Sequence, residues 1–491
     1  MLVAPSAHFH FVDLAHSFLD GRLDTDTPRR RAGSKPRADD PAGLQDAVNR
    51  HLGGPKGTNG WNDWASYRVL TLKGGQTVRG VFPFKDTNGP RKHELWTLDG
   101  ASMVVDVAND LQKGCDPKRT YARCDETVWQ VSFPPFPAVV MLPLAAAFGY
   151  DVNDVWVTLL FAVASPLLLF FWLGRMRADG LAPLRDRDRV WWCLAFAFGT
   201  VAWYCGIRGQ VWFTALTMGV TLHFAYLIAA WRARFPLLAG VILGVGVATR
   251  TPLLFSALFL PLEAFFPDGR WLGGRGREGL AIAVRKVALF ALPMAMAGAA
   301  LAWYNWARWD NPLEFGHLYL LEGGRGPTRE HGLFSFFFLN NNLSAALTNM
   351  PRLVAHSPWL QVTRHGLGIL VCSPMLLALL GRRGHANAGV DATAPEATGD
   401  EADLVRRRDS VVRHLWVSVL AVAIPALLYQ NDGWEQFGYR FALDFWPPLA
   451  GILALRLPKL DRRVRVLIVL AIVIQLFGAI TFGRMGHFYY D

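Results

Sequence analysis

The chain has 491 residues, of which 52% are hydrophobic and only 18% are charged. So small a charged fraction cannot cover the surface of a water-soluble protein of this length, and the composition therefore predicts a membrane protein. The formal net charge is +11. Its basic residues lie in short clusters between apolar runs, a distribution that indicates membrane topology and argues against a nucleic-acid partner.

The first predicted element is an amphipathic helix within residues 8–26, HFHFVDLAHSFLDGRLDTD. Its apolar face comprises Phe11, Leu14, Ala15, Phe18 and Leu19, and its polar face comprises His10, Asp13, His16, Ser17 and Asp20. We expect this helix to lie in the membrane interface. The polar face is either solvated or presents Asp13 to a lipid-borne substrate. His8 and His10 have no obvious third partner, so a metal site is not indicated.

The rest of the region before residue 154 has three predicted parts. Residues 27–60 are rich in Pro, Gly and charge and predict a flexible insertion. YRVLTLKGGQTVRGVF, residues 67–82, predicts a β-hairpin around Gly-Gly, and HELWTL, residues 93–98, is a candidate third strand. SFPPFPAVVMLPLAAAFG, residues 132–149, predicts an interfacial helix that is too short to span a membrane.

Cys115 and Cys124 share one hydrophilic loop of this region at C-x8-C spacing. We expect them to form a disulfide if the loop is extracytoplasmic, because disulfides persist in oxidising compartments.

The apolar windows that are long enough to cross a membrane fall near 154–174, 190–206, 211–231, 287–304, 366–381, 414–430, 442–456 and 464–483. Residues 236–266 are too long for one span and are interrupted by TRTP at 249–252. This stretch predicts a hairpin of two short helices. The fold class is therefore an all-α polytopic membrane protein with about ten visible membrane helices and a small α/β extracytoplasmic region.

The positive-inside rule orients these helices. Lys and Arg cluster at 175–189, 232–234, 268–286, 382–413 and 456–465. Two short helices at 236–266 keep the clusters on either side of them on the cytoplasmic side. Within 382–413, residues 385–403 predict a disordered linker.

This topology gives four predicted regions. Residues 1–153 form a first extracytoplasmic loop, 154–304 are transmembrane, 305–365 form a second extracytoplasmic loop, and 366–491 hold the C-terminal transmembrane helices. A first loop on the outside requires an earlier span, so we expect the open reading frame to begin upstream with a basic, apolar segment.

Three polar groups stand out at the predicted outer surface, namely Arg250, residues 431–447 and residues 304–319. Arg250 lies between the two short helices, where it either closes an ion pair with Asp13, Glu314 or Asp444 or holds a phosphate. In NDGWEQFGYRFALDFWP, residues 431–447, Arg440 and Asp444 have the i, i+4 spacing of an intrahelical salt bridge.

Aromatic residues accompany amides and carboxylates in 431–447 and in YNWARWDNPLEFGHLY, residues 304–319. Such a mixture either anchors a protein at the membrane interface or binds sugars. No Walker loop, HExxH, GxSxG or dinucleotide motif occurs in a credible setting, which argues against chemistry on soluble nucleotides.

Four blocks resemble the GT-C superfamily of polytopic membrane glycosyltransferases, near the branch of aminoarabinose transferases and protein O-mannosyltransferases. The blocks are the helix at residues 8–24, WQVSFPPFPAVVMLPLAAAFG, GVATRTP, and YNWARWDNPLEFG together with GWEQFGYRFALDFWP. They occur in the order of the family and spread over almost the whole chain. The resemblance implies a GT-C-like fold in a bacterial cytoplasmic membrane, with large extracytoplasmic loops.

The resemblance also implies an enzyme that moves a sugar from a polyprenyl-phosphate donor to a glycan, lipid or protein acceptor of the cell envelope. Asp13 matches the family's general base, with Asp24 and Asp26 as alternatives because an acidic neighbour usual in the family is replaced by His10 and His16. The family's arginines that bind the donor phosphate correspond to Arg250, Arg440 and Arg208. The candidates for substrate contacts are His10, Glu314, Tyr439 and Asp444.

The lipid-linked sugar is then a substrate, and neither a cofactor nor a divalent metal is indicated. Two other functions are compatible with the same residues. A transporter or flippase of lipid-linked sugars would use the arginines without a base, although the large outer loops and the lack of an internal repeat argue against a carrier. A scaffold that binds a polyprenyl lipid would need no catalysis.

Overall fold

The computed structural model describes residues 4–6, 8–26, 64–81, 92–106, 109–112, 125–320, 326–380 and 399–490. The predicted insertion at 27–60 and the predicted Cys115–Cys124 disulfide lie outside these residues. The chain divides into two compact units. Unit 1 holds residues 155–297 and 334–491, and unit 2 holds residues 3–154 and 298–333. The predicted second outer loop, 305–365, is therefore shared between them.

Unit 2 contains an antiparallel sheet in the order β4-β3-β2-β1-β5. Its strands are β1 (Trp64–Thr71), β2 (Thr77–Val81), β3 (Lys92–Thr97), β4 (Ser102–Asp106) and β5 (Asp125–Val131). The predicted hairpin is confirmed as β1 and β2, which pair Thr71 with Thr77. Gly74 and Gly75 both have positive φ in the connecting turn, a conformation that glycine adopts without steric cost. The predicted third strand is confirmed as β3.

Helix α1 (His10–Leu19) packs against α3 (Phe136–Phe148) in unit 2. His10, Asp13 and Ser17 on the polar face of α1 are buried, whereas Asp20 at the end of this face is exposed. The interpretation in which the whole face is solvated is therefore wrong, although both helices form where the sequence predicts them. At about 1.5 Å per residue, α3 is about 20 Å long and too short to span a membrane. The 3-10 helices η2 (Gly149–Asp151) and η7 (His317–Tyr319) and helix α11 (Gly326–His331) complete unit 2.

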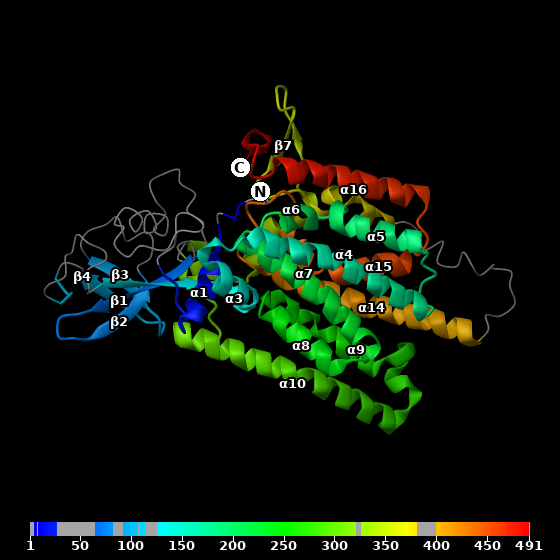
Figure 1. Cartoon of the computed structure of the whole chain (residues 1–491), viewed down its shortest axis with the longest axis horizontal. Helices are drawn as coiled ribbons and strands as arrows, with labels where there is room; N and C mark the ends of the chain where they lie inside the picture. Colours follow the sequence, from blue (N-terminus) through cyan, green and yellow to red (C-terminus); the bar gives the residue numbers. More distant parts are fainter. Residues whose placement is uncertain are drawn as a thin grey trace. The chain divides into compact units, whose positions relative to one another are not determined.

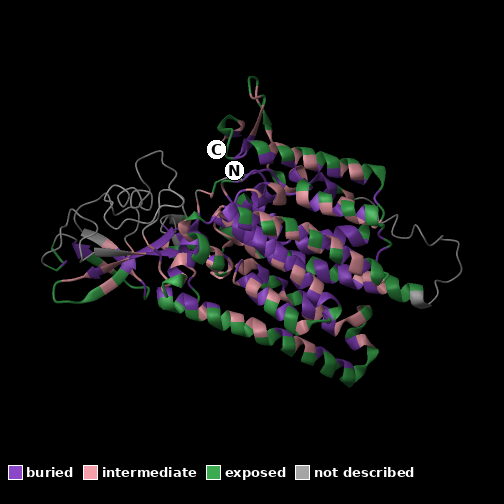
Figure 2. Ribbon diagram, viewed as in Figure 1, coloured by how far each residue is buried: buried purple, intermediate pink, exposed green. Residues whose placement is uncertain are grey.

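In the part of the chain that the structure describes, five helices are long and apolar enough to cross a membrane, and Figure 1 labels each of them. They are α4 (Asp154–Ala178), α7 (Val211–Ala230), α10 (Gly276–Trp309), α14 (Gly399–Leu428) and α16 (Arg462–Thr481). Each coincides with a predicted span. Helix α10 is exposed along most of its apolar length (Figure 2), as expected of a surface that faces lipid. Together with two small sheets, these helices are consistent with a mostly helical membrane protein.

Three predicted spans are wrong as continuous helices. Residues 190–206 divide into α5 (Asp186–Gly199) and α6 (Ala202–Gly206), because Thr200 is extended and its hydroxyl accepts a hydrogen bond from the Ala202 N–H at the start of α6. Residues 366–381 form only α13 (Ile369–Cys372) and the 3-10 helix η10 (Pro374–Leu379). Pro374 has no N–H for a continuing helix and disfavours helical geometry at Ser373.

Residues 442–456 are interrupted in a similar way, by Pro447 in the first turn of α15 (Trp446–Arg456). The preceding 3-10 helix, η11 (Arg440–Asp444), ends before Phe445. In contrast, the two predicted short helices of 236–266 are confirmed. They are α8 (Pro236–Val247) and a second helix made of η4 (Thr251–Leu258) and α9 (Phe259–Phe265).

The remaining elements of unit 1 are short. Those before α10 are η3 (Trp231–Ala233), η5 (Pro267–Gly269) and η6 (Trp271–Gly274), and those after it are η8 (Phe336–Phe338), α12 (Leu339–Leu343), the π-helical turn η9 (Ser344–Thr348), η12 (Gly486–Phe488) and the sheet of β6 (Arg352–Leu353), β7 (Leu360–Thr363) and β8 (Tyr489–Tyr490). Residues 399–403 of the predicted disordered linker are helical, because they begin α14. Residues 385–398 lie outside the described part of the chain.

Small polar residues join α4 to α7 inside unit 1. The Thr158 and Thr214 hydroxyl oxygens are 2.6 Å apart, and those of Ser165 and Thr221 are 2.8 Å apart. Both pairs are separated by two helical turns on each helix, so the same faces meet twice. Small hydroxyl residues allow close approach of helices in a membrane, where apolar burial alone gives little association energy.

Candidate functional site

The candidate site in unit 1 is an arginine cluster, which we define as Arg208, Arg250 and Arg440 together with Asp444. Arg250 follows α8, and Pro252 starts a new 3-10 helix two residues later, so the backbone of Arg250 is extended between them. Its Nε donates to Asp444 Oδ1 at 3.1 Å and its Nη2 to Oδ2. The ion pair that the sequence left open for Arg250 is therefore made with Asp444.

The predicted intrahelical salt bridge between Arg440 and Asp444 is wrong. Both residues lie in η11, whose 3-10 geometry does not place residues four apart above one another as an α-helix does. Asp444 instead faces Arg250, which comes from the break between α8 and η4.

His223 of α7 fixes the backbone of Asp444. Its Nδ1 is 2.9 Å from the Asp444 carbonyl oxygen and its Nε2 is 2.7 Å from Ser256 Oγ. A carbonyl only accepts, so Nδ1 carries a proton, and in the neutral imidazole Nε2 then accepts from the Ser256 hydroxyl. The Ser418 hydroxyl, 2.8 Å from Ser256 Oγ, then donates to it. A fully buried chain of hydrogen bonds thus holds Asp444, and no sequence pattern indicated His223.

Arg440 and Arg250 flank the same aromatic ring. The guanidinium carbon of each lies 5.7 Å from the centroid of Phe441, and that of Arg440 is also 5.5 Å from the ring of Phe213. Arg208 lies over Phe482 at 4.5 Å and donates from Nη2 to the Phe482 carbonyl. The ring of Tyr204 packs on both Phe482 and Phe213, with ring centroids 5.5 and 5.8 Å apart, and so connects the surroundings of Arg208 and Arg440. The three arginines therefore lie in one region of unit 1.

Arg208 Nε and the hydroxyl of Tyr439, which precedes Arg440, are buried and have no hydrogen-bond partner among the described residues. Arg208 also makes no ion pair with a described residue. A buried donor without a partner is costly, and such atoms are found where a ligand or water completes the site.

In unit 2 the predicted base, Asp13, is buried on α1. His10 precedes it by one turn and stacks on Trp64, with ring centroids 4.3 Å apart. The two alternative bases have a different environment. Asp24 and Asp26 pair with Arg22 at 3.5 and 2.8 Å, and both keep 40% of their side-chain surface exposed. Burial thus distinguishes Asp13 from both alternatives.

Glu314 accepts hydrogen bonds from the loop that contains it. Its Oε1 accepts a hydrogen bond of 2.6 Å from the N–H of Gly316, whose φ of 92° is left-handed. Burial raises the pKa of Glu314, and the backbone N–H groups of Gly316 and Leu318 partly oppose the shift. These contacts occupy Glu314 Oε1 within its own loop, so they account for its burial without a substrate.

Arg308 is a further buried residue of unit 2 that the sequence analysis did not single out. Its Nη1 donates to the Val131 carbonyl at 2.8 Å and its Nη2 to Asn305 Oδ1 at 3.1 Å. It joins the end of α10 to β5, so its role is structural.

The structure thus gathers Arg208, Arg250, Arg440, Tyr439 and Asp444 in unit 1, and places Asp13, His10 and Glu314 in unit 2. Among the described residues, no three His, Cys, Asp or Glu side chains are grouped as metal ligands. In comparisons with known proteins, no family model, no curated protein and no solved structure matches the chain.

Proposed function

We propose that the protein is a GT-C-like glycosyltransferase with about ten membrane crossings in a bacterial-type cytoplasmic membrane. It moves a sugar from a polyprenyl-phosphate donor to an envelope acceptor on the extracytoplasmic side. The observation that carries the proposal is the arginine cluster. Three arginines lie in one region inside a membrane protein, where buried positive charge is costly without an anion, and a lipid-borne phosphate is such an anion.

The chemistry requires one base and a stabilised leaving group. The Asp13 carboxylate accepts the proton of the acceptor hydroxyl, and the acceptor oxygen forms a bond to the anomeric carbon of the sugar. The bond from that carbon to the phosphate oxygen breaks, and the polyprenyl phosphate leaves as an anion. Arg208 and Arg440 stabilise its charge, because Arg250 already holds Asp444 with two of its nitrogens.

The experiment is complementation of a deletion strain, followed by mass spectrometry of its lipids and envelope glycans. We expect the deletion to accumulate a polyprenyl-phosphate sugar and to lose one glycan modification. Wild type should restore the profile, and Asp13→Asn should not. Asp20→Asn is the matched control, because Asp20 follows the same helix and keeps 62% of its side-chain surface exposed.

The variants separate the alternative functions. A flippase requires the arginines but not the base, so restoration by Asp13→Asn combined with failure of Arg440→Gln would replace the transferase by a transporter. An unchanged lipid and glycan profile in the deletion strain would exclude both the transferase and the transporter, and the scaffold would be the remaining function. Membrane levels of each variant must match wild type for these comparisons.

A further inference from the structure

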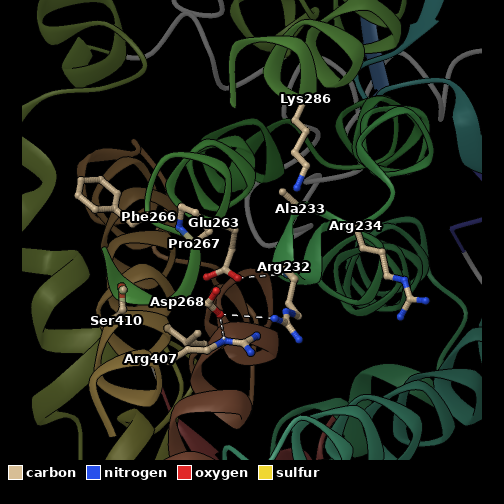
Figure 3. Close-up of a pocket in the computed structure, with 12 residues that line it drawn as sticks. Arg232, Ala233, Arg234, Glu263, Phe266, Pro267, Asp268, Lys286, Arg407 and Ser410 are labelled. Atoms are coloured by element: carbon tan, nitrogen blue, oxygen red, sulfur yellow. Dashed lines mark hydrogen bonds and ion pairs between the residues drawn. The ribbon is translucent and has the colours of Figure 1, made fainter. Parts of the chain in front are cut away.

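A second polar site lies in unit 1, at the other end of the α8–α9 helix pair from Arg250. It is a pocket of about 420 Å³ (Figure 3). Arg232 lies shortly before the start of α8, whereas Arg250 follows its end. Twelve helical residues at about 1.5 Å each separate these ends by about 18 Å. The pocket is therefore distinct from the arginine cluster.

The pocket is built from three segments that are far apart in the sequence. Arg232 follows α7, Asp268 lies between α9 and α10, and Arg407 is on the first turns of α14. Phe266 and Pro267 add an apolar wall. Basic pockets among membrane helices are suited to anionic lipid headgroups.

The acidic side chains around the pocket are already paired within the protein. Asp268 Oδ1 lies 3.4 Å from both Arg232 Nη2 and Arg407 Nε. Asp179 also contacts both arginines, at 3.4 and 3.9 Å. Glu263 Oε1 is 2.7 Å from His414 Nδ1, and its Oε2 accepts from the backbone N–H of Arg232 at 3.1 Å. These contacts hold Arg232 and Arg407 in place.

Lys286 of α10 lines the pocket beside the paired arginines Arg232 and Arg407. It is half-buried and makes no hydrogen bond or ion pair with any described residue. In Figure 3 its side chain points toward Ala233 and Arg232, whereas the guanidinium of Arg234 turns away from the other charged groups. A lysine near a helix end commonly extends to the headgroup region on its own. Lys286 instead extends into a preformed pocket.

We propose that this pocket binds a phosphate group, with Lys286 as the cation that contacts it. The phosphate accepts hydrogen bonds from the Lys286 ammonium and from Arg232, whose side chain is 45% exposed. Phe266 and Pro267 then contact the carbon skeleton that carries the phosphate. The phosphate belongs either to an anionic phospholipid or to a soluble phosphate ester, and this binding is independent of the glycosyltransferase proposal.

The test measures binding to the full chain purified in detergent. Phosphatidylglycerol, phosphatidylcholine and glycerol phosphate are titrated separately, and bound ligand is counted by native mass spectrometry. Lys286→Gln should weaken phosphatidylglycerol binding about tenfold, since one charge-assisted contact is lost. Lys286→Arg should retain binding. Arg285→Gln is the matched control, because Arg285 precedes Lys286 on α10, is exposed and does not line the pocket.

A Lys286-dependent loss of phosphatidylglycerol binding, with no such loss for glycerol phosphate, supports a lipid as the source of the phosphate. A Lys286-dependent loss with glycerol phosphate alone supports a soluble ester. The proposal is overturned if Lys286→Gln binds every ligand as wild type does, or if Arg285→Gln loses as much. Lys286→Met, which keeps an unbranched chain in an apolar helix, must show the same loss and covers the case in which the glutamine variant does not fold.

Discussion

Arg250 and Asp444 are 194 residues apart in the chain and form a bidentate ion pair inside unit 1. The carboxylate is almost fully buried, with 1% of its side chain exposed, and the guanidinium retains 13%. His223 holds the carbonyl of Asp444, so the pair has little freedom to rearrange. The pair joins the break after α8 to η11.

The first prediction concerns the stability of this pair. Replacing either residue alone leaves a buried charge without its partner, so Arg250→Leu and Asp444→Leu should each lower the free energy of unfolding by about 3–5 kcal/mol. The double variant should lose less than the sum, because it leaves no buried charge. Thermal unfolding of the four proteins in one detergent measures the coupling. Additive losses in the double variant would mean that the two charges do not stabilise each other.

The second prediction changes the position of Arg250 without changing any charge. Gly219 on α7 faces it, and a Cβ at this position would lie 2.8 Å from Arg250 Cγ. Gly219→Ala should therefore displace the arginine, at a cost of about 1–3 kcal/mol for overpacking. The displaced Arg250 no longer holds Asp444, which shares η11 with the phosphate-binding Arg440. We therefore expect weaker binding of a polyprenyl monophosphate, measured by titration, together with lower thermal stability.

Gly298→Ala is the control for the Gly219 variant, because it lies in helix α10 with no atom within 4 Å of an added Cβ. Both substitutions gain about 1 kcal/mol of helix propensity, so the difference between the variants isolates the clash. Equal stability and equal lipid binding of the two variants would show that Arg250 does not depend on the space beside Gly219.

Local sequence signals were sufficient for elements whose pattern is continuous. The Gly-Gly turn predicted β1 and β2, and apolar length predicted α4, α7, α10, α14 and α16. The same window reasoning failed at 366–381, because average hydropathy does not register the interruption at Pro374. The number of crossings therefore remains a prediction, although the break at Arg250 between two short helices was readable from TRTP.

The partners of buried polar residues could not be predicted, because they depend on contacts between distant segments. From the sequence, Asp13, Glu314 and Asp444 were all candidate ion-pair partners of Arg250. Only the packing of η11 beside α7 selects Asp444. Likewise, helical periodicity identified the polar face of α1 but not its burial. No sequence pattern indicated Lys286 as a binding residue, because a lysine beside Arg285 resembles the basic end of any membrane helix.

The third prediction concerns Glu314, whose carboxylate accepts from the Gly316 N–H in unit 2. Burial raises its pKa above the ordinary value of 4.5, so the folded chain binds the proton more tightly than the unfolded chain. Its contribution to stability is then fully present below about pH 4.5 and is lost as pH rises through the raised pKa. The loss is at most about 1.4 kcal/mol per pH unit for one proton.

Glu314→Gln resembles the protonated side chain and still accepts from the Gly316 N–H, so its stability should not fall in this way. We expect the unfolding temperature of wild type to decrease relative to the variant as pH increases from about 4.5 toward neutrality. Glu330→Gln is the control, because 72% of that side chain is exposed. The pH profile of Glu330→Gln should follow that of wild type. If the profile of Glu314→Gln also ran parallel to wild type across this range, the raised pKa of Glu314 would be contradicted. Burial would then impose no net cost on the Glu314 carboxylate.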